Sequence, residues 1–254
     1  MRTMRKPLIA GNWKMHKTEA EAISLVRKLI QGVKTQTVVD ILLCPPFTSL
    51  SQLHKLLVSS PILLGAQNIS EQKSGAYTGE ISAEMAAEFC SHVILGHSER
   101  RALYDESDEL INRKIKSALS VDLIPVLCVG ELLEERESGE AANVISRQLQ
   151  IALNGIQLPD PDKLVIAYEP VWAIGSGKSA SADDTGNLIG GVIRPTLAGK
   201  WGEDKAKRIR VLYGGSVNPG NARGFFSQSE IDGALVGGAS LSADKFIGII
   251  EQAS

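Results

Sequence analysis

Short apolar runs recur along the whole chain at intervals that suit strands alternating with helices. Most runs have apolar residues at consecutive positions, as expected of parallel strands that are covered on both faces. Eight such runs are present, and we expect a strand at each: residues 8–10, 38–44, 62–66, 93–95, 123–129, 164–168, 209–213 and 234–236.

The segments between these runs have helical spacing. In residues 19–30, Ala22, Val26 and Leu29 share one side, which predicts an amphipathic helix. A second helix is expected over 108–119, where acidic residues precede its positive end. Residues 186–191 contain three glycines. Because each glycine costs about 1 kcal/mol relative to alanine in a helix, we expect that helix to be short, frayed or interrupted.

Eight strands alternating with helices indicate a parallel sheet, and the count favours a closed (β/α)₈ barrel over an open doubly wound sheet. No GxGxxG follows the first strand, which further weakens the dinucleotide-binding alternative. No linker, low-complexity tract or shift in composition marks a boundary. We therefore expect residues 1–254 to form a single barrel domain, a length that α/β barrels often fill.

Composition narrows the classes of partner. The net charge is −2, so no bulk field would recruit nucleic acid or an anionic membrane. The apolar runs are too short to span a bilayer, and the basic start of the chain lacks a signal-peptide core. Cys44, Cys90 and Cys128 are odd in number and form no CxxC, which favours a reducing compartment and argues against a zinc site. We expect a cytoplasmic protein.

One carboxylate stands between the sixth apolar run and a loop. The residues are Ala167-Tyr168-Glu169-Pro170-Val171-Trp172-Ala173-Ile174-Gly175-Ser176-Gly177-Lys178. Pro170 ends the strand and holds Glu169 extended. A carboxylate at the end of a buried strand, followed by a loop with stiff ends and a glycine tip, indicates a catalytic base beneath a closing lid. The alternative is a strand end that meets a surface loop.

Other strand ends also carry reactive or anion-binding residues, and in a (β/α)₈ barrel all of them lie on one face. Asn12 and Lys14 follow the first strand, and on an extended segment they would point to the same side. The loops Gly214-Gly215-Ser216 and Gly237-Gly238-Ala239-Ser240 follow the seventh and eighth strands. Glycine loops at these two positions favour a phosphate site over simple turns.

His97 follows the fourth strand and precedes a short predicted helix. The positive end of that helix disfavours a second positive charge, so His97 would stay neutral and donate a hydrogen bond. We interpret His16, His54 and His92 as structural donors, and the acidic stretch 131–140 as a solvated helix face and loop. No spacing predicts a metal site, and no redox cofactor is indicated. This set of groups favours proton abstraction beside a carbonyl in a small phosphorylated compound.

The chain resembles the triosephosphate isomerase family in motifs that span nearly its whole length and keep the family's order. The matching segments are Gly11-Asn12-Trp13-Lys14, Gly65-Ala66-Gln67-Asn68, Gly75-Ala76-Tyr77-Thr78-Gly79-Glu80, Gly96-His97-Ser98-Glu99-Arg100, Cys128-Val129-Gly130-Glu131, Tyr168 to Gly175, Tyr213-Gly214-Gly215-Ser216-Val217 and Val236-Gly237-Gly238-Ala239-Ser240-Leu241.

The resemblance implies roles for these residues. Glu169 would shuttle the proton, His97 would be the neutral electrophile, and Lys14 and Asn12 would position and stabilise the substrate. Residues 171–178 would form the lid. The implied reaction interconverts dihydroxyacetone phosphate and glyceraldehyde 3-phosphate, a step of glycolysis and gluconeogenesis, without a cofactor. The phosphate would be held by backbone N–H groups of Gly175, Ser216, Gly237 and Gly238.

The resemblance further implies a homodimer in which the loop 75–80 inserts into the neighbouring subunit, whereas the residues alone favour a mobile surface loop. It places Cys128 near Glu169, where it would pack the base. Ser176 stands where the family usually has Thr, which keeps the hydroxyl. Two alternatives stay open: another phosphosugar isomerase or epimerase, and a barrel that binds a phosphorylated metabolite without catalysis.

Overall fold

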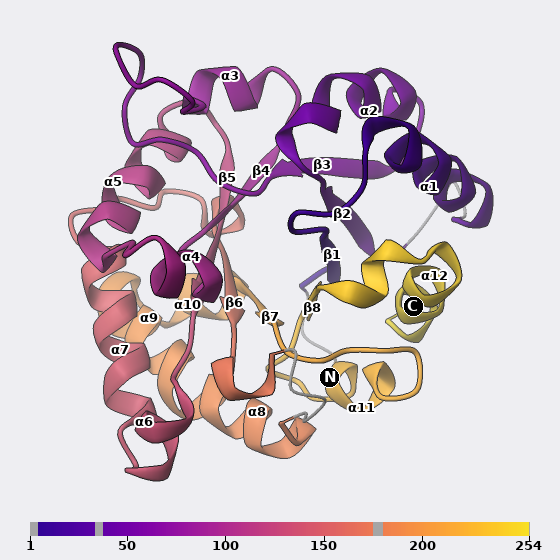
Figure 1. Cartoon of the computed structure of the whole chain (residues 1–254). Helices are drawn as coiled ribbons and strands as arrows, with labels where there is room; N and C mark the ends of the chain where they lie inside the picture. The colour runs from indigo at the N-terminus through magenta and orange to yellow at the C-terminus, as the bar shows by residue number, and fades with distance from the viewer. Residues whose placement is uncertain (1–4, 34–37, 175–179, 254) are drawn as a thin grey trace.

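The computed structural model describes residues 5–33, 38–174 and 180–253 of the chain. Its eight parallel strands pair in sequence order, and β8 pairs with β1 to close the barrel. Figure 1 shows the strands at the centre with the helices around them. The predicted (β/α)₈ barrel is confirmed. The strands are β1 (Leu8–Asn12), β2 (Asp40–Cys44), β3 (Ile62–Ala66), β4 (His92–Leu95), β5 (Ile124–Val129), β6 (Val165–Tyr168), β7 (Arg210–Tyr213) and β8 (Gly233–Val236).

Helices follow the strands and cover the outside of the barrel. Both long helices that we predicted are present, and Ala22, Val26 and Leu29 are buried on the first. Within the described residues, no helix is long and apolar enough to cross a membrane. The helices are α1 (Glu19–Gly32), α2 (Leu50–Leu57), α3 (Ala83–Ala87), α4 (Ser98–Leu103), α5 (Asp108–Leu119), α6 (Leu133–Glu137), α7 (Ala141–Ala152), α8 (Ala182–Leu188), α9 (Arg194–Trp201), α10 (Glu203–Arg208), α11 (Ala222–Phe226) and α12 (Ala243–Gln252).

Two local expectations have different outcomes. The glycine-rich helix is interrupted as predicted, because α8 gives way to a π-helical turn, Ile189–Ile193, before α9 begins. The strand predicted over 38–44 is shorter than expected, because β2 begins at Asp40 and Val38 is largely exposed. The apolar residues Val38 and Val39 precede the strand, so the predicted strand began two residues too early.

Alternation along each strand sends every second side chain into the barrel. The interior cluster contains Leu8 and Ala10 of β1, and Val165 and Ala167 of β6. Two residues further along, the same faces carry Asn12 and then Glu169. The packing of the barrel interior therefore places these two polar residues directly above the apolar core, at the carboxyl ends of the strands.

At the opposite end, the same alternation puts charged residues into the floor of the barrel. Asp40 accepts a hydrogen bond from Arg210 at 2.8 Å. It also forms an ion pair with Lys6 at 2.6 Å. His92 is buried beside them, with Nδ1 2.8 Å from the Ser91 hydroxyl. Burial and the nearby Arg210 lower the pKa of His92 to about 4.

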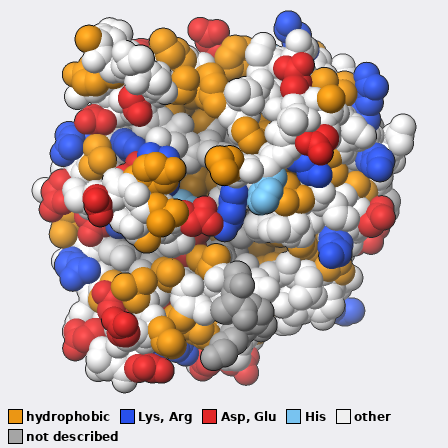
Figure 2. All heavy atoms as spheres, in the orientation of Figure 1, with side chains coloured by type: hydrophobic (Ala, Val, Ile, Leu, Met, Phe, Trp, Pro, Cys, Tyr) orange, Lys and Arg blue, Asp and Glu red, His pale blue; other side chains and the backbone are white. Residues whose placement is uncertain are grey.

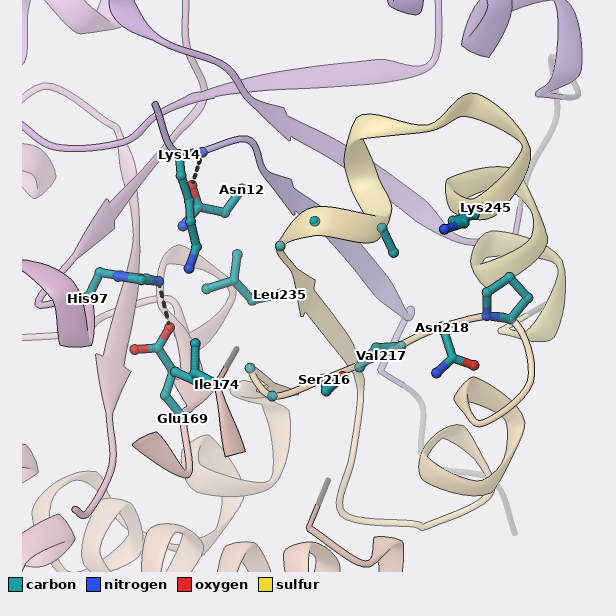
Figure 3. Close-up of a pocket in the computed structure, with 16 residues that line it drawn as sticks. Asn12, Lys14, His97, Glu169, Ile174, Ser216, Val217, Asn218, Leu235 and Lys245 are labelled. Carbon is teal, nitrogen blue, oxygen red and sulfur yellow. Dashed lines mark hydrogen bonds and ion pairs between the residues drawn. The ribbon is translucent and has the colours of Figure 1, made fainter. Parts of the chain in front are cut away.

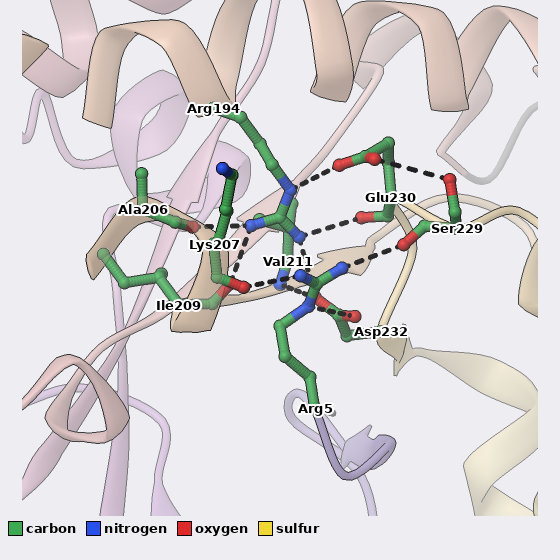
Figure 4. A network of polar contacts seen from close by, with 9 residues as sticks. All are labelled: Arg5, Arg194, Ala206, Lys207, Ile209, Val211, Ser229, Glu230 and Asp232. Atoms are coloured by element: carbon green, nitrogen blue, oxygen red, sulfur yellow. Dashed lines mark hydrogen bonds and ion pairs between the residues drawn. The ribbon is translucent and has the colours of Figure 1, made fainter. Parts of the chain in front are cut away.

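A second polar network joins the start of the chain to the floor (Figure 4). The Arg5 guanidinium donates to Asp232 Oδ1 at 2.6 Å and to the backbone carbonyls of Lys207 and Ser229. Arg194 donates to the other oxygen of Asp232 at 3.0 Å. Arg5 and Lys6 belong to no motif in the sequence. Through Asp232 and Asp40 they join the beginning of the chain to β8 and β2.

Candidate active site

A cavity of about 400 Å³ opens at the carboxyl ends of the strands. It brings together seven of the predicted catalytic and phosphate-binding residues from five parts of the chain, and Figure 3 labels five of them. Its lining is Asn12, Lys14, His97, Glu169, Ile174, Gly214, Gly215, Ser216, Val217, Asn218, Pro219, Leu235, Gly237, Gly238, Ala239 and Lys245.

Two glycines shape the place that Glu169 occupies. A side chain at Gly130 would bring its Cβ within 1.7 Å of the Glu169 carbonyl oxygen, and one at Gly214 would come within 2.7 Å of Glu169 Cγ. Both contacts are shorter than any atom could make without displacing Glu169. We had assigned Gly214 to an anion-binding loop. In the structure Gly214 also leaves room for the Glu169 side chain.

Glu169 is 2% exposed, and its carboxylate is held by two donors. Oε2 accepts from the backbone N–H of Ser98 at 3.0 Å, and Oε1 lies 3.1 Å from His97 Nε2. Cys128 lies beside Glu169, as the resemblance implied, and its thiol pKa is raised by burial and by that carboxylate. Neither donor to Glu169 is a permanently charged group, so the carboxylate can exchange them for a substrate.

The hydrogen bonds of His97 identify its protonated nitrogen. His97 caps the N-terminus of α4, and its Nδ1 accepts from the backbone N–H of Glu99 at 3.3 Å. A nitrogen that accepts a hydrogen bond carries no proton, so the proton of the neutral ring is on Nε2, which faces Glu169. The Glu99 carboxylate lies 3.6 Å from Nδ1, beyond hydrogen-bond distance, and pairs with Lys14 instead.

Lys14 reaches the cavity from a turn, which corrects the extended segment that we expected. Its φ of 52° is in the left-handed region. Its N–H donates to Asn12 Oδ1 at 3.0 Å, and its carbonyl accepts from Gln67 Nε2 at 2.8 Å. The ammonium group lies 2.5 Å from Glu99 Oε1. Gln67 belongs to one of the family motifs, but the residue pattern gives no signal for its contact with the backbone of Lys14.

The glycine loops after β7 and β8 leave backbone donors free in the wall of the same cavity. Among the described residues, none accepts a hydrogen bond from the backbone N–H of Ser216, Gly237 or Gly238. Asn221 Nδ2 donates to the Ser216 carbonyl at 3.0 Å and fixes that loop. Three unpaired N–H groups that line one cavity form a suitable cradle for an anion. Gly175, the fourth predicted donor, lies outside the described residues.

Glu131 corrects the interpretation of 131–140 as a solvated segment. Its side chain is 0% exposed, whereas every acidic residue from 132 to 140 is exposed or half-buried. Its Oε1 accepts from the Tyr168 hydroxyl at 3.1 Å and from Trp172 Nε1 at 2.9 Å. Arg136 stacks over the Trp172 ring with its guanidinium carbon 4.7 Å from the ring centre. Glu131 therefore holds the beginning of the predicted lid.

Only the first half of the predicted lid can be described. Residues Val171–Ala173 form a short 3₁₀ turn, and Ile174 lines the cavity. Residues 175–178 lie outside the described part of the chain. The loop 75–80 is exposed throughout, with Tyr77 47% exposed, and Gly75 and Gly79 have φ values of 130° and 95°. These values are accessible to glycine and rarely to other residues.

Comparisons with known proteins agree with this geometry. A model of the family described as triosephosphate isomerase matches residues 7–253. The triosephosphate isomerase of Caldanaerobacter subterraneus subsp. tengcongensis is 50% identical to the chain, over 97% of this chain and 99% of its own length. That of Dictyoglomus thermophilum is also 50% identical, over 98% of this chain and 100% of its own length. A crystal structure of triosephosphate isomerase from Bartonella henselae superposes with a TM-score of 0.88 at 39% identity, over 97% of this chain and 98% of that one. The chain therefore belongs to the triosephosphate isomerase family of intramolecular aldose–ketose isomerases.

Proposed function

We propose that the chain interconverts dihydroxyacetone phosphate and D-glyceraldehyde 3-phosphate through an enediolate, without a cofactor. The observation that carries this proposal is the contact between Glu169 and a neutral His97 at 3.1 Å, in a cavity whose other end presents free backbone donors. A base, a hydrogen-bond donor and an anion cradle are the groups that proton transfer in a phosphorylated carbonyl compound requires.

In the proposed reaction, Glu169 removes a proton from the carbon next to the carbonyl group. The electron pair of the broken C–H bond moves into a C=C bond, and the carbonyl oxygen takes up negative charge. His97 Nε2–H donates to that oxygen, and the ammonium of Lys14 stabilises it. A second proton moves from the hydroxyl oxygen on the deprotonated carbon to the former carbonyl oxygen, and His97 Nε2 is placed to relay it. The protonated Glu169 then returns its proton to the neighbouring carbon. The C=C electron pair forms this new C–H bond and the released O–H pair forms the new C=O bond, so the isomerisation ends with no net change in protonation.

The substrate has to separate the two catalytic side chains. Glu169 is bonded to Ser98 N–H and to His97 without a ligand, so both bonds must be exchanged for contacts with the triose. The bonds are made with neutral donors, so this exchange breaks no ion pair. Asn12 turns its carboxamide oxygen toward the backbone of Lys14, and we assign its amide group to the substrate.

We assign the phosphate to the N–H groups of Ser216, Gly237 and Gly238, with Gly175 as the predicted fourth donor. Residues 171–178 would close over the bound triose and exclude water. The contact between Trp172 and Glu131 at 2.9 Å supports a hinge at the beginning of this segment, because closure would have to rearrange it.

We also propose that the chain acts as a homodimer and that residues 1–254 form one domain. Met15 is 94% exposed directly after Lys14, and Tyr77 is half exposed on the loop 75–80. Apolar side chains exposed beside catalytic residues favour a subunit interface. Three buried thiols that form no disulfide support a cytoplasmic location. Sedimentation analysis would test the dimer.

A coupled turnover assay tests the function. The purified chain should convert both trioses in the absence of added metal or nucleotide, and should not turn over pentose phosphates. Turnover of a pentose phosphate instead would favour another phosphosugar isomerase or epimerase. Binding of inorganic phosphate without turnover of any triose would indicate the non-catalytic barrel.

A further inference from the structure

The cavity extends beyond the groups that the proposed reaction uses. Past Ser216 it is lined by Asn218, Pro219 and Lys245. Figure 3 shows Lys245 at the far side of the view from His97 and Glu169, with its ammonium nitrogen directed from α12 back toward the cavity. None of the described residues forms an ion pair with Lys245, so its charge is available to a ligand.

The charges at the reacting end do not attract a dianion. Lys14 is paired with Glu99 at 2.5 Å, and Glu169 adds a second negative charge. With His97 neutral, these groups sum to −1. A triose phosphate is itself an anion, so the reacting end alone would repel it. Figure 2 shows acidic and basic side chains intermixed over this face of the molecule, with no broad positive region to compensate. The positive charge of Lys245, which also lines the cavity, brings the sum over Lys14, Glu99, Glu169 and Lys245 to zero.

The packing of α12 places Lys245 beside the phosphate loop. Gly248, three residues later on the same side of the helix, lies against Pro219, where an added Cβ would be 3.1 Å from the proline ring. This close approach brings the first turn of α12 next to the loop after β7. The loop itself is fixed, because Asn218 N–H donates to Asn221 Oδ1 at 2.8 Å and Asn218 Oδ1 accepts from Gly220 N–H at 2.9 Å.

We infer that Lys245 is a positioning residue that draws the phosphate of the substrate to the Gly237–Gly238 end of the cavity. The inference rests on the proposed function. With a negative reacting end and a positive far end, the cavity has a polarity that matches a molecule with an anionic tail and an uncharged carbonyl head. Lys245 acts on the phosphate across water, so it contributes to binding and orientation and not to the proton transfer.

The test compares steady-state kinetics of charge variants with D-glyceraldehyde 3-phosphate. A unit charge several ångströms from a dianion in a water-like medium changes affinity by about fivefold. At an ionic strength of about 0.01 M we expect Lys245→Gln to raise KM about fivefold with kcat unchanged, Lys245→Glu to raise it further, and Lys245→Arg to resemble the unsubstituted chain. At about 0.5 M salt the differences should nearly vanish. Inorganic phosphate as a competitive inhibitor should weaken in parallel.

Lys28→Gln is the matched control, because Lys28 is an exposed lysine on α1 and does not line the cavity. Equal KM values for Lys245→Gln and Lys28→Gln at low salt would overturn the inference. So would a loss confined to kcat or independent of salt, which would indicate a structural role for Lys245. Absence of triose turnover in the unsubstituted chain would instead overturn the proposed function, so the two failures are distinguishable.

Discussion

Two buried carboxylates at opposite ends of the barrel are held in opposite ways. Asp232, on the floor side, accepts from the guanidinium groups of Arg5 and Arg194 and from the Val211 N–H at 2.8 Å. Glu169, at the rim, accepts from one backbone N–H and one neutral imidazole. Burial raises the pKa of Asp232, and the two arginines oppose that rise. A structural carboxylate is thus fixed by charges, while the proposed base has donors that it can leave.

The comparison predicts that the floor determines stability and the rim determines rate. Removal of one partner from a buried ion pair leaves the other charge uncompensated, at a cost of about 3–5 kcal/mol. Displacement of a catalytic group by about 1 Å costs on the order of 10²-fold in rate. Four substitutions test this division, and the expected free-energy effects decrease from the first to the last.

Asp232→Asn should lower the free energy of unfolding by about 3–5 kcal/mol, because Arg5 and Arg194 lose their shared counter-charge. Urea denaturation at one fixed protein concentration measures it. Turnover per folded molecule should stay unchanged. Asp160→Asn is the control, since Asp160 pairs with Arg208 on the surface, where a pair contributes less than about 1 kcal/mol. Equal losses in the two variants would contradict the proposed role of the floor network.

His92 should make stability depend on pH. Its pKa is lowered to about 4 in the folded chain from an ordinary value of 6.5, so the unfolded chain binds more protons between these values. The contribution of neutral His92 to the free energy of unfolding is therefore fully present above pH 6.5. It is lost as the pH falls toward 4, by at most about 3 kcal/mol. The difference in unfolding free energy between the unsubstituted chain and His92→Gln should shrink over this range. A constant difference would contradict a neutral buried His92.

Glu169→Asp should lower kcat on the order of 10²-fold, equivalent to about 2.7 kcal/mol, since the shorter side chain moves the carboxylate by about 1 Å. Thermal unfolding should remain close to that of the unsubstituted chain. Turnover near the original value would exclude Glu169 as the base, and a large drop in thermal stability would show that the rim also stabilises the fold.

Gly214→Ala should lower kcat about tenfold, because the new Cβ would meet Glu169 Cγ at 2.7 Å and tilt the carboxylate away from its productive position. Gly224→Ala is the matched control on α11, where an added Cβ meets no atom within 4 Å. If both variants retain full activity, Gly214 does not shape the place of the base.

The barrel was predictable because each strand is a local apolar run, and the convergence of strand ends follows from the architecture. Asn12 and Glu169 lie two residues beyond interior positions of β1 and β6, so alternation alone directs them to the rim. Strand ends were less predictable. Val38 belongs to an apolar run in the sequence, but it is exposed and lies before the start of β2.

Contacts between distant segments could not be predicted in the same way. Gly130 and Gly214 directly follow β5 and β7, and each approaches Glu169 from there. Gln67 donates a hydrogen bond to the backbone of Lys14 from 53 residues away. Glu131 stands in an acidic run that is otherwise largely solvated, and its burial depends on Tyr168 and Trp172. Its position directly after Gly130, at the end of β5, was the one local signal that separated it from the residues that follow.

The attachment of Arg5 to the floor has a practical consequence for how the protein is expressed and handled. A chain that begins at or before residue 5 retains this guanidinium, whereas a protease that trims residues 1–5 removes it. Such trimming would leave the composition of the catalytic rim untouched and yet deprive Asp232 of one of its two cationic partners. Preparations that differ only in their first residues should therefore be matched by mass spectrometry before their melting temperatures are compared.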